Sequence, residues 1–281
     1  FRSSLVYDCI ERAMDLVEGG SVYSADGGPT AGTISAGDSL AALDEIVFNQ
    51  KLLTMEQVLH AMNTNYEDMD TVPSGPEIRA ILVNKAPKFG NDDERADKWV
   101  VELEDYIGSS YRYKYRSSKY GKGPVPCCYS YSQSPVTGNI AFGKSIGATP
   151  DGRKDGQPVN NGISPANGSE KNGATAACNS VMKLPSIWFQ KGAIFNMRLS
   201  KGALDTDENK EKVIAMIKVL FENYGQQIQF NVVDNKVFKK AMEHPDEYKD
   251  LMVRVSGYSA LFTSLSPECQ MDVINRAELE L

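Results

Sequence analysis

The stretch Arg254-Val255-Ser256-Gly257-Tyr258-Ser259-Ala260 lies near the end of the chain. The apolar and β-branched run at 251–255, where the stretch begins, is typical of a short strand. After it comes Ser266-Pro267-Glu268, where a serine N-cap, a proline at the first helical position and an acid in the first turn predict a helix start. We therefore expect Gly257 in a loop between a strand and a helix, where glycine permits positive φ and close backbone approach.

This stretch closely resembles the C-terminal signature of the glycyl radical enzymes, the pyruvate formate-lyase superfamily, and the likeness continues through Gln270, Asp272, Ile274 and Arg276. In that family a glycine loses a Cα hydrogen and stores an unpaired electron, so the resemblance implies that Gly257 bears the radical. Glycine suits this chemistry because a Cα radical is delocalised over the flanking amide nitrogen and carbonyl. A side chain would oppose the planar geometry and block the hydrogen transfers.

Further segments carry the same resemblance, at 142–154, 161–165 and 171–176. The fold that it implies is α/β, as part of a ten-stranded α/β barrel with the glycine loop inserted toward its centre. We expect residues 1–150 to be the C-terminal part of the barrel domain and 151–281 to be the glycine radical domain.

Local patterns agree with an α/β class, because helices and strands alternate in the second half of the chain. Alternating apolar residues predict a strand over 227–233, with Ile228, Phe230 and Val232 on one face. Loops are expected at 21–37 and, with few regular elements, at 124–180. Helical periodicity and capping signals predict helices at 4–17, after Asp38, after Thr54, after Ser74, after Asn91, at 209–224, at 235–243 and after Ser266.

Composition limits the classes of partner and the cellular location that we expect for this protein. The 281 residues carry a net charge of −7, which argues against nucleic acid and anionic membranes as partners. No stretch approaches the ~20 apolar residues of a transmembrane helix. The five cysteines show no CxxC pair or other zinc spacing, so no metal site is expected and free thiols in a reducing cytoplasm are the default. The resemblance adds an anaerobic organism to this cytoplasmic location.

Two motifs suggest other chemistry. Residues 138–145 satisfy the phosphate-loop pattern GxxxxGK[ST], so a nucleotide-binding protein is a distant alternative. A phosphate loop needs a helix starting at its lysine, and the Ile-Gly-Ala-Thr-Pro that follows Ser145 cannot sustain one. The basic, tyrosine-rich run at 111–116 could bind a single strand of nucleic acid, but a surface strand or loop is favoured in this acidic chain.

The cysteines and histidines are expected to be structural. In pyruvate formate-lyase an adjacent cysteine pair carries the thiyl radical, but Cys127-Cys128 lies too close to Gly257 for that role, and no Gly-Cys-x-Glu string is present. The thiyl cysteine and its companion glutamate would then lie upstream of these residues. His60 and His244 have no companion ligands in sequence and are expected to be solvated or to cap helices.

The substrate is inferred from resemblance. Residues 188–196 and 260–263 are most similar to the 4-hydroxyphenylacetate decarboxylases, which release carbon dioxide from an aromatic acid to give a cresol and which carry a small iron–sulfur subunit. Resemblance to that branch suggests that Glu18, before Gly19-Gly20, faces the substrate and hydrogen-bonds its phenolic hydroxyl. The alternative within the family is a diol dehydratase or a C–N or C–S eliminase. An alternative outside catalysis is a module that supplies a fresh glycine loop to a damaged enzyme.

The resemblance also implies the cofactor and partners. A separate activating enzyme makes the glycyl radical with S-adenosylmethionine and an iron–sulfur cluster, so this chain binds no cofactor directly. The expected partners are that activase, the N-terminal part of the barrel, the small iron–sulfur subunit, a small aromatic acid and further copies or subunits in an oligomer. Without the rest of the barrel these residues would expose apolar strand faces, so we do not expect them to fold alone.

Overall fold

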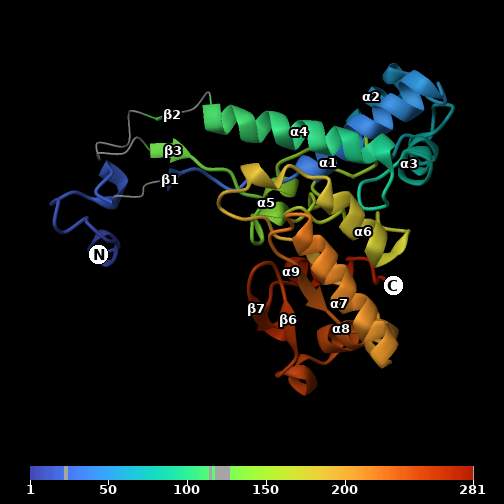
Figure 1. The fold of residues 1–281 in the computed structure, drawn as a ribbon. Helices are drawn as coiled ribbons and strands as arrows, with labels where there is room; N and C mark the ends of the chain where they lie inside the picture. The colour runs from blue at the N-terminus through green and yellow to red at the C-terminus, as the bar shows by residue number, and fades with distance from the viewer. Residues whose placement is uncertain (22–24, 114–115, 118–126, 281) are drawn as a thin grey trace.

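The structure is a computed structural model that describes residues 1–21, 25–113, 116–117 and 127–280. The N-terminal segment lies at one side of the molecule, away from the C-terminal elements (Figure 1). Among the described residues, no helix has the length and apolar character needed to cross a membrane.

Four helices make up much of the first half of the chain. They are α1 (Thr33–Ala42), prolonged by a π-helical segment at Leu43–Asn49, then α2 (Met55–Asn63), α3 (Gly75–Asn84) and α4 (Glu94–Tyr113). The capping box predicted at Thr54 is confirmed, because its hydroxyl accepts from Gln57 N at 3.2 Å and its N–H donates to Gln57 Oε1 at 2.8 Å. α1 and α4 pack closely because Gly37 leaves room for Val100, whose Cγ2 lies 2.4 Å from where a Cβ would be.

The predicted helix at 4–17 is wrong. Only two single turns of 3₁₀ helix form there, at Ser3–Leu5 and Leu16–Glu18. Asp8 and Ala13 adopt left-handed φ values of +72° and +49°, which a right-handed helix cannot contain. The apolar side chains of Leu5, Ile10 and Val17 are exposed, so no packing against a core stabilises a helix in this segment. α1 also begins earlier than predicted, at Thr33 instead of after Asp38.

The strands are short and form three separate sheets among the described residues. β1 (Ala25–Asp26), β3 (Cys127–Tyr129) and β2 (Arg116–Ser117) pair in that order; β4 (Asn196–Arg198) pairs in parallel with β5 (Gln229–Asn231); β6 (Met252–Arg254) pairs antiparallel with β7 (Ser259–Leu261). The α/β class is confirmed, whereas closure of a ten-stranded barrel stays a prediction. The backbone of Cys127–Tyr129 lies in β3, and the side chains of both cysteines lie outside the described residues.

The region expected to be mostly irregular contains two helices, α5 (Gly138–Lys144) and α6 (Gly173–Met182). α5 covers the phosphate-loop pattern and ends at Lys144, so that lysine lies at a helix C-terminus and not at the N-terminus that binds phosphate. Lys144 Nζ instead lies 2.6 Å from Glu268 Oε1 in an exposed ion pair. The geometry excludes a phosphate loop here.

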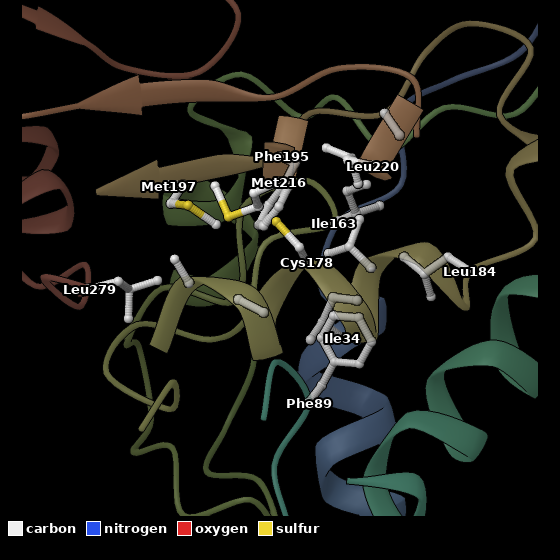
Figure 2. Packing of buried hydrophobic residues seen from close by; sticks show 14 of the residues in the cluster. Ile34, Phe89, Ile163, Cys178, Leu184, Phe195, Met197, Met216, Leu220 and Leu279 are labelled. Carbon is white, nitrogen blue, oxygen red and sulfur yellow. The ribbon is translucent and has the colours of Figure 1, made fainter. Parts of the chain in front are cut away.

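The C-terminal helices are confirmed. They are α7 (Asp207–Glu222), α8 (Asn235–Glu243) and α9 (Pro267–Ile274), and Ser266 caps α9 as predicted. The main core joins α6, α7 and β4 through Cys178, Met216 and Met197 (Figure 2). A separate core stabilises the end of the chain, where Phe238 of α8 stacks on Phe262 at 4.7 Å between ring centroids, next to Val253 of β6.

Asp38, which is fully buried in α1, predicts a pH-dependent stability. Its Oδ1 accepts from Phe89 N at 2.7 Å, its Oδ2 makes no hydrogen bond within the described residues, and burial raises its pKa to about 7 against the opposing charge of Lys88. Between the unfolded and folded pKa values the folded state binds more protons, so this group lowers stability as pH rises from about 4 to 7.

We expect D38N to stabilise the full-length protein at pH 8 and to change little at pH 5, because the amide oxygen still accepts from Phe89. Each pKa unit is worth about 1.4 kcal/mol, so the gain is a few kcal/mol. Thermal denaturation of both proteins at the two pH values measures it. An equal effect at pH 5 and pH 8 would contradict the prediction.

Candidate functional site

The candidate site is centred on Gly257, at the turn of the hairpin between β6 and β7. Val255 N donates to Tyr258 O at 2.9 Å, and Gly257 is the third residue of this four-residue turn with φ of +75°. A positive φ lies in the left-handed region, which glycine adopts without the steric cost that a Cβ would add. The expected strand-to-helix loop is therefore a hairpin turn, because β7 is inserted before α9. We call residues 255–258 the glycine loop.

Two side chains hydrogen-bond the backbone of Gly257 itself. Gln229 Oε1, from β5, accepts from Gly257 N at 3.1 Å, and Arg254 Nη2 donates to Gly257 O at 3.2 Å. Arg254 Nε also donates to the same Gln229 Oε1 at 2.8 Å, and Nη1 donates to Ser259 Oγ at 3.3 Å. These contacts show that the Arg254 guanidinium orients a backbone carbonyl of the glycine loop.

The base of the hairpin is held by buried polar groups. Asn231 of β5 bonds both backbone groups of Arg254, with its Nδ2 2.7 Å from Arg254 O and its Oδ1 2.9 Å from Arg254 N. Arg276 Nη2 donates to Val255 O at 2.7 Å and pairs with Asp272 Oδ2 at 3.2 Å. Both ion-pair side chains are at least nine-tenths buried.

A series of hydrogen-bonded, buried amide side chains connects the glycine loop to residues 139, 161 and 196. Ser256 Oγ donates to Asn161 Oδ1 at 2.7 Å, and Asn161 Nδ2 donates to Asn139 Oδ1 at 3.2 Å. On the other side, the Gln229 amide donates to Asn196 of β4. The segments 161–165 and 271–276, far apart in sequence, thus support the same loop.

Sequence reasoning missed these amides. It assigned Ile228, Phe230 and Val232 to one face of a strand, and the structure packs Ile228 and Phe230 against the main core only partly buried. Gln229 and Asn231, on the other face, are more buried and point to the hairpin. The available signal was a pair of amide residues at alternate positions in an otherwise apolar strand. Such a pattern indicates that the second face of the strand is also buried and that the amides have hydrogen-bond partners there.

Ile194, which lines an open cleft of about 630 Å³, also packs against the glycine loop. Ile194 Cδ1 lies 3.1 Å from where a Cβ on Gly257 would be. The segment 188–196 also contributes Phe189, Gln190 and Lys191 to the wall of the cleft, and Gln226 and Gln227 are among the lining residues outside that segment.

Comparison with known proteins shows which family the chain belongs to. A model described as "Pyruvate formate lyase-like" matches residues 1–142, and one described as "Glycine radical" matches residues 159–263, which include the glycine loop. The chain belongs to the pyruvate formate lyase-like family of glycyl radical enzymes. The finer division at residue 150 stays a prediction.

The relatives of this glycyl radical enzyme chain include dehydratases. It is 38% identical over 278 residues to "Probable dehydratase YbiW" of Escherichia coli (98% of this chain, 34% of that protein), and 35% identical over 280 residues to trans-4-hydroxy-L-proline dehydratase of Clostridioides difficile (98% and 33%). The structure matches the glycerol-bound B12-independent glycerol dehydratase of Clostridium butyricum with a TM-score of 0.87 at 36% identity, over 99% of this chain and 34% of that one. The chain thus spans about a third of the length of these relatives.

Other predicted residues of this glycyl radical enzyme chain lie apart from the loop. Glu18 is exposed, and its Oε2 accepts from Asp15 N at 3.3 Å, which is a local capping contact. His60 Nε2 lies 2.6 Å from Asp68 Oδ2 on the surface, and His244 follows the last residue of α8. Within the described part of the chain, no three His, Cys, Asp or Glu side chains gather as a metal site would require.

Proposed function

We propose that this chain is the radical-bearing part of a glycyl radical dehydratase or related eliminase, and that Gly257 is the residue that carries the radical. The observation that carries the proposal is the hydrogen-bonding of both backbone groups of a left-handed Gly257 within the region that matches the glycine radical model. The dehydratase relatives support elimination of water from a small hydroxylated substrate.

In the proposed mechanism, an activating enzyme removes one hydrogen atom from Gly257 Cα. The glycyl radical then takes a hydrogen atom from a cysteine thiol upstream of these residues, which restores the glycine and leaves a thiyl radical. The thiyl radical takes a hydrogen atom from the substrate carbon, and the substrate radical loses the neighbouring hydroxyl group together with a proton as water, which leaves a product radical that receives the hydrogen atom. Return of the hydrogen atom from the cysteine completes the turnover. The partners proposed are the activase and the upstream barrel residues, in an oligomer in the cytoplasm of an anaerobe.

Decarboxylation of 4-hydroxyphenylacetate is the second candidate. It is favoured by the resemblance at 188–196, because this segment lines the cleft beside the loop. The relatives named above favour dehydration instead, and the exposed, locally bonded Glu18 gives the phenol-binding role no support in this arrangement. The small iron–sulfur subunit and the aromatic acid belong to this second candidate only.

The test is anaerobic activation of the full-length enzyme with its activase, S-adenosylmethionine and reductant. We expect an EPR doublet from a carbon-centred radical, and cleavage on exposure to air that releases a peptide beginning near Gly257. Samples without the activase should show neither. The activated enzyme is then offered glycerol, 1,2-propanediol, trans-4-hydroxy-L-proline, isethionate and 4-hydroxyphenylacetate. Absence of both radical and cleavage with a competent activase would overturn the proposal, and cresol as the main product would favour the second candidate.

A further inference from the structure

Gln229 and Arg254 contact the two backbone groups that flank the Cα of Gly257. Gln229 accepts from its N–H, Arg254 donates to its C=O, and the two side chains are joined by the 2.8 Å bond from Arg254 Nε to Gln229 Oε1. We call Gln229 and Arg254 the amide clamp. The clamp thus links the N–H of Gly257 to its C=O through two hydrogen-bonded side chains.

The direction of each bond matters for an unpaired electron at Cα. Delocalisation needs the amide nitrogen to release electron density and the carbonyl to accept it. An acceptor on the N–H makes the nitrogen a better electron donor, and a cationic donor on the carbonyl oxygen makes the carbonyl a better acceptor. Hydrogen bonds to charged groups are also stronger than neutral ones. Both bonds of the clamp therefore act in the same sense.

We propose that the amide clamp stabilises the Gly257 radical electronically, with Gln229 and Arg254 as positioning residues that spread its spin density onto the flanking amides. This inference rests on the proposed function, since it assumes that Gly257 bears the radical. It goes beyond anchoring, because other groups already anchor the hairpin: Asn231 and Arg276 bond the backbone of Arg254 and Val255, and Ser256 bonds Asn161.

The clamp is also built with support of its own. Gln229 is buried, and its Nε2 donates to Asn196, which orients Oε1 toward the loop. The backbone N–H of Asn196 in turn donates to Ser164 Oγ at 2.8 Å, which fixes the position of Asn196. Arg254 has its backbone bonded on both sides by Asn231, so the guanidinium projects from a fixed base. The side chains thus have few alternative positions.

The experiment compares EPR spectra of activated full-length enzyme carrying Q229M, R254M or R254K with the wild type. Loss of either bond concentrates spin on Cα, so we expect Q229M and R254M to widen the doublet splitting caused by the remaining α-hydrogen and to lower radical content severalfold. R254K, which keeps a cation, should give an intermediate splitting. The matched control is S256A, which removes a loop anchor without touching either bond of Gly257, and its splitting should equal that of the wild type.

Distinct outcomes separate the two levels of inference. If the wild type forms no radical, the proposed function fails first. If the wild type and variants form radicals with identical splitting, or if S256A shifts it equally, the clamp is only an anchor and the inference is overturned. Where a variant forms no radical, hydrogen exchange of unactivated protein over residues 255–260 decides. Exchange at Gly257 N–H that Q229M leaves as slow as in the wild type would also overturn it.

Discussion

Replacing Gly257 by alanine is expected to leave the full-length enzyme folded while abolishing both the EPR doublet and turnover. The backbone cost is modest, since an L-residue at φ of +75° loses about 1–2 kcal/mol. The new Cβ would lie 3.1 Å from Ile194 Cδ1, the flexible end of a side chain that can yield. Radical formation should be lost completely, because a methyl group crowds the Cα from which hydrogen atoms are removed and opposes planarity of the radical.

The matched control is G156A. Gly156 has a nearly equal φ of +72°, and a Cβ there meets no atom within 4 Å. The G156A substitution therefore introduces the same backbone strain outside the glycine loop. We expect G156A to melt within a few degrees of G257A and to form the radical normally. EPR, oxygen-dependent cleavage and thermal denaturation of all three proteins measure this. A radical of normal yield in G257A would show that another residue carries it.

Local capping and turn chemistry accounted for the parts of the fold that the sequence predicted well. Thr54 and Ser266 each accept from a backbone N–H three residues away, so their effect can be predicted from the sequence alone. The failed helix at 4–17 depended on a core that these residues do not reach. A periodic stripe is evidence for a helix only where something covers it, and the sequence does not say where that is.

The same reasoning explains what was predicted of the site. Gly257 could be proposed as the radical residue because the motif that suggests this role is one continuous stretch, with Arg254 within it. Gln229 was missed because its bond to Gly257 depends on tertiary packing that brings β5 beside β6, two strands of separate sheets and of separate parts of the chain. Glu18 was proposed from resemblance alone, and its local capping contact shows how little a helix-end carboxylate specifies by itself.

Removing the charge of Arg276 is expected to have the largest effect on the stability of the hairpin. In R276M, Asp272 loses its cation in a site where its side chain is 5% exposed, and Val255 O loses the 2.7 Å bond from Arg276. Breaking a buried pair by removing one partner costs about 3–5 kcal/mol. Asp272 keeps the amide donors of Asn139 and Asn167, each at 3.1 Å, so the lower end of that range applies.

Hydrogen exchange over residues 252–261 of the full-length enzyme measures this loss, and about 3 kcal/mol corresponds to roughly hundredfold faster exchange through local opening. The control K249M removes a cation from an exposed pair, 3.0 Å from Asp246, and should leave exchange unchanged. If the unpaired charge dominates, adding D272N to R276M recovers part of the protection, because the amide is neutral. Equal exchange in the single and double variants would instead assign the loss to the bond with Val255. Oxygen-dependent cleavage should follow the same order as exchange, since an open glycine loop exposes the radical.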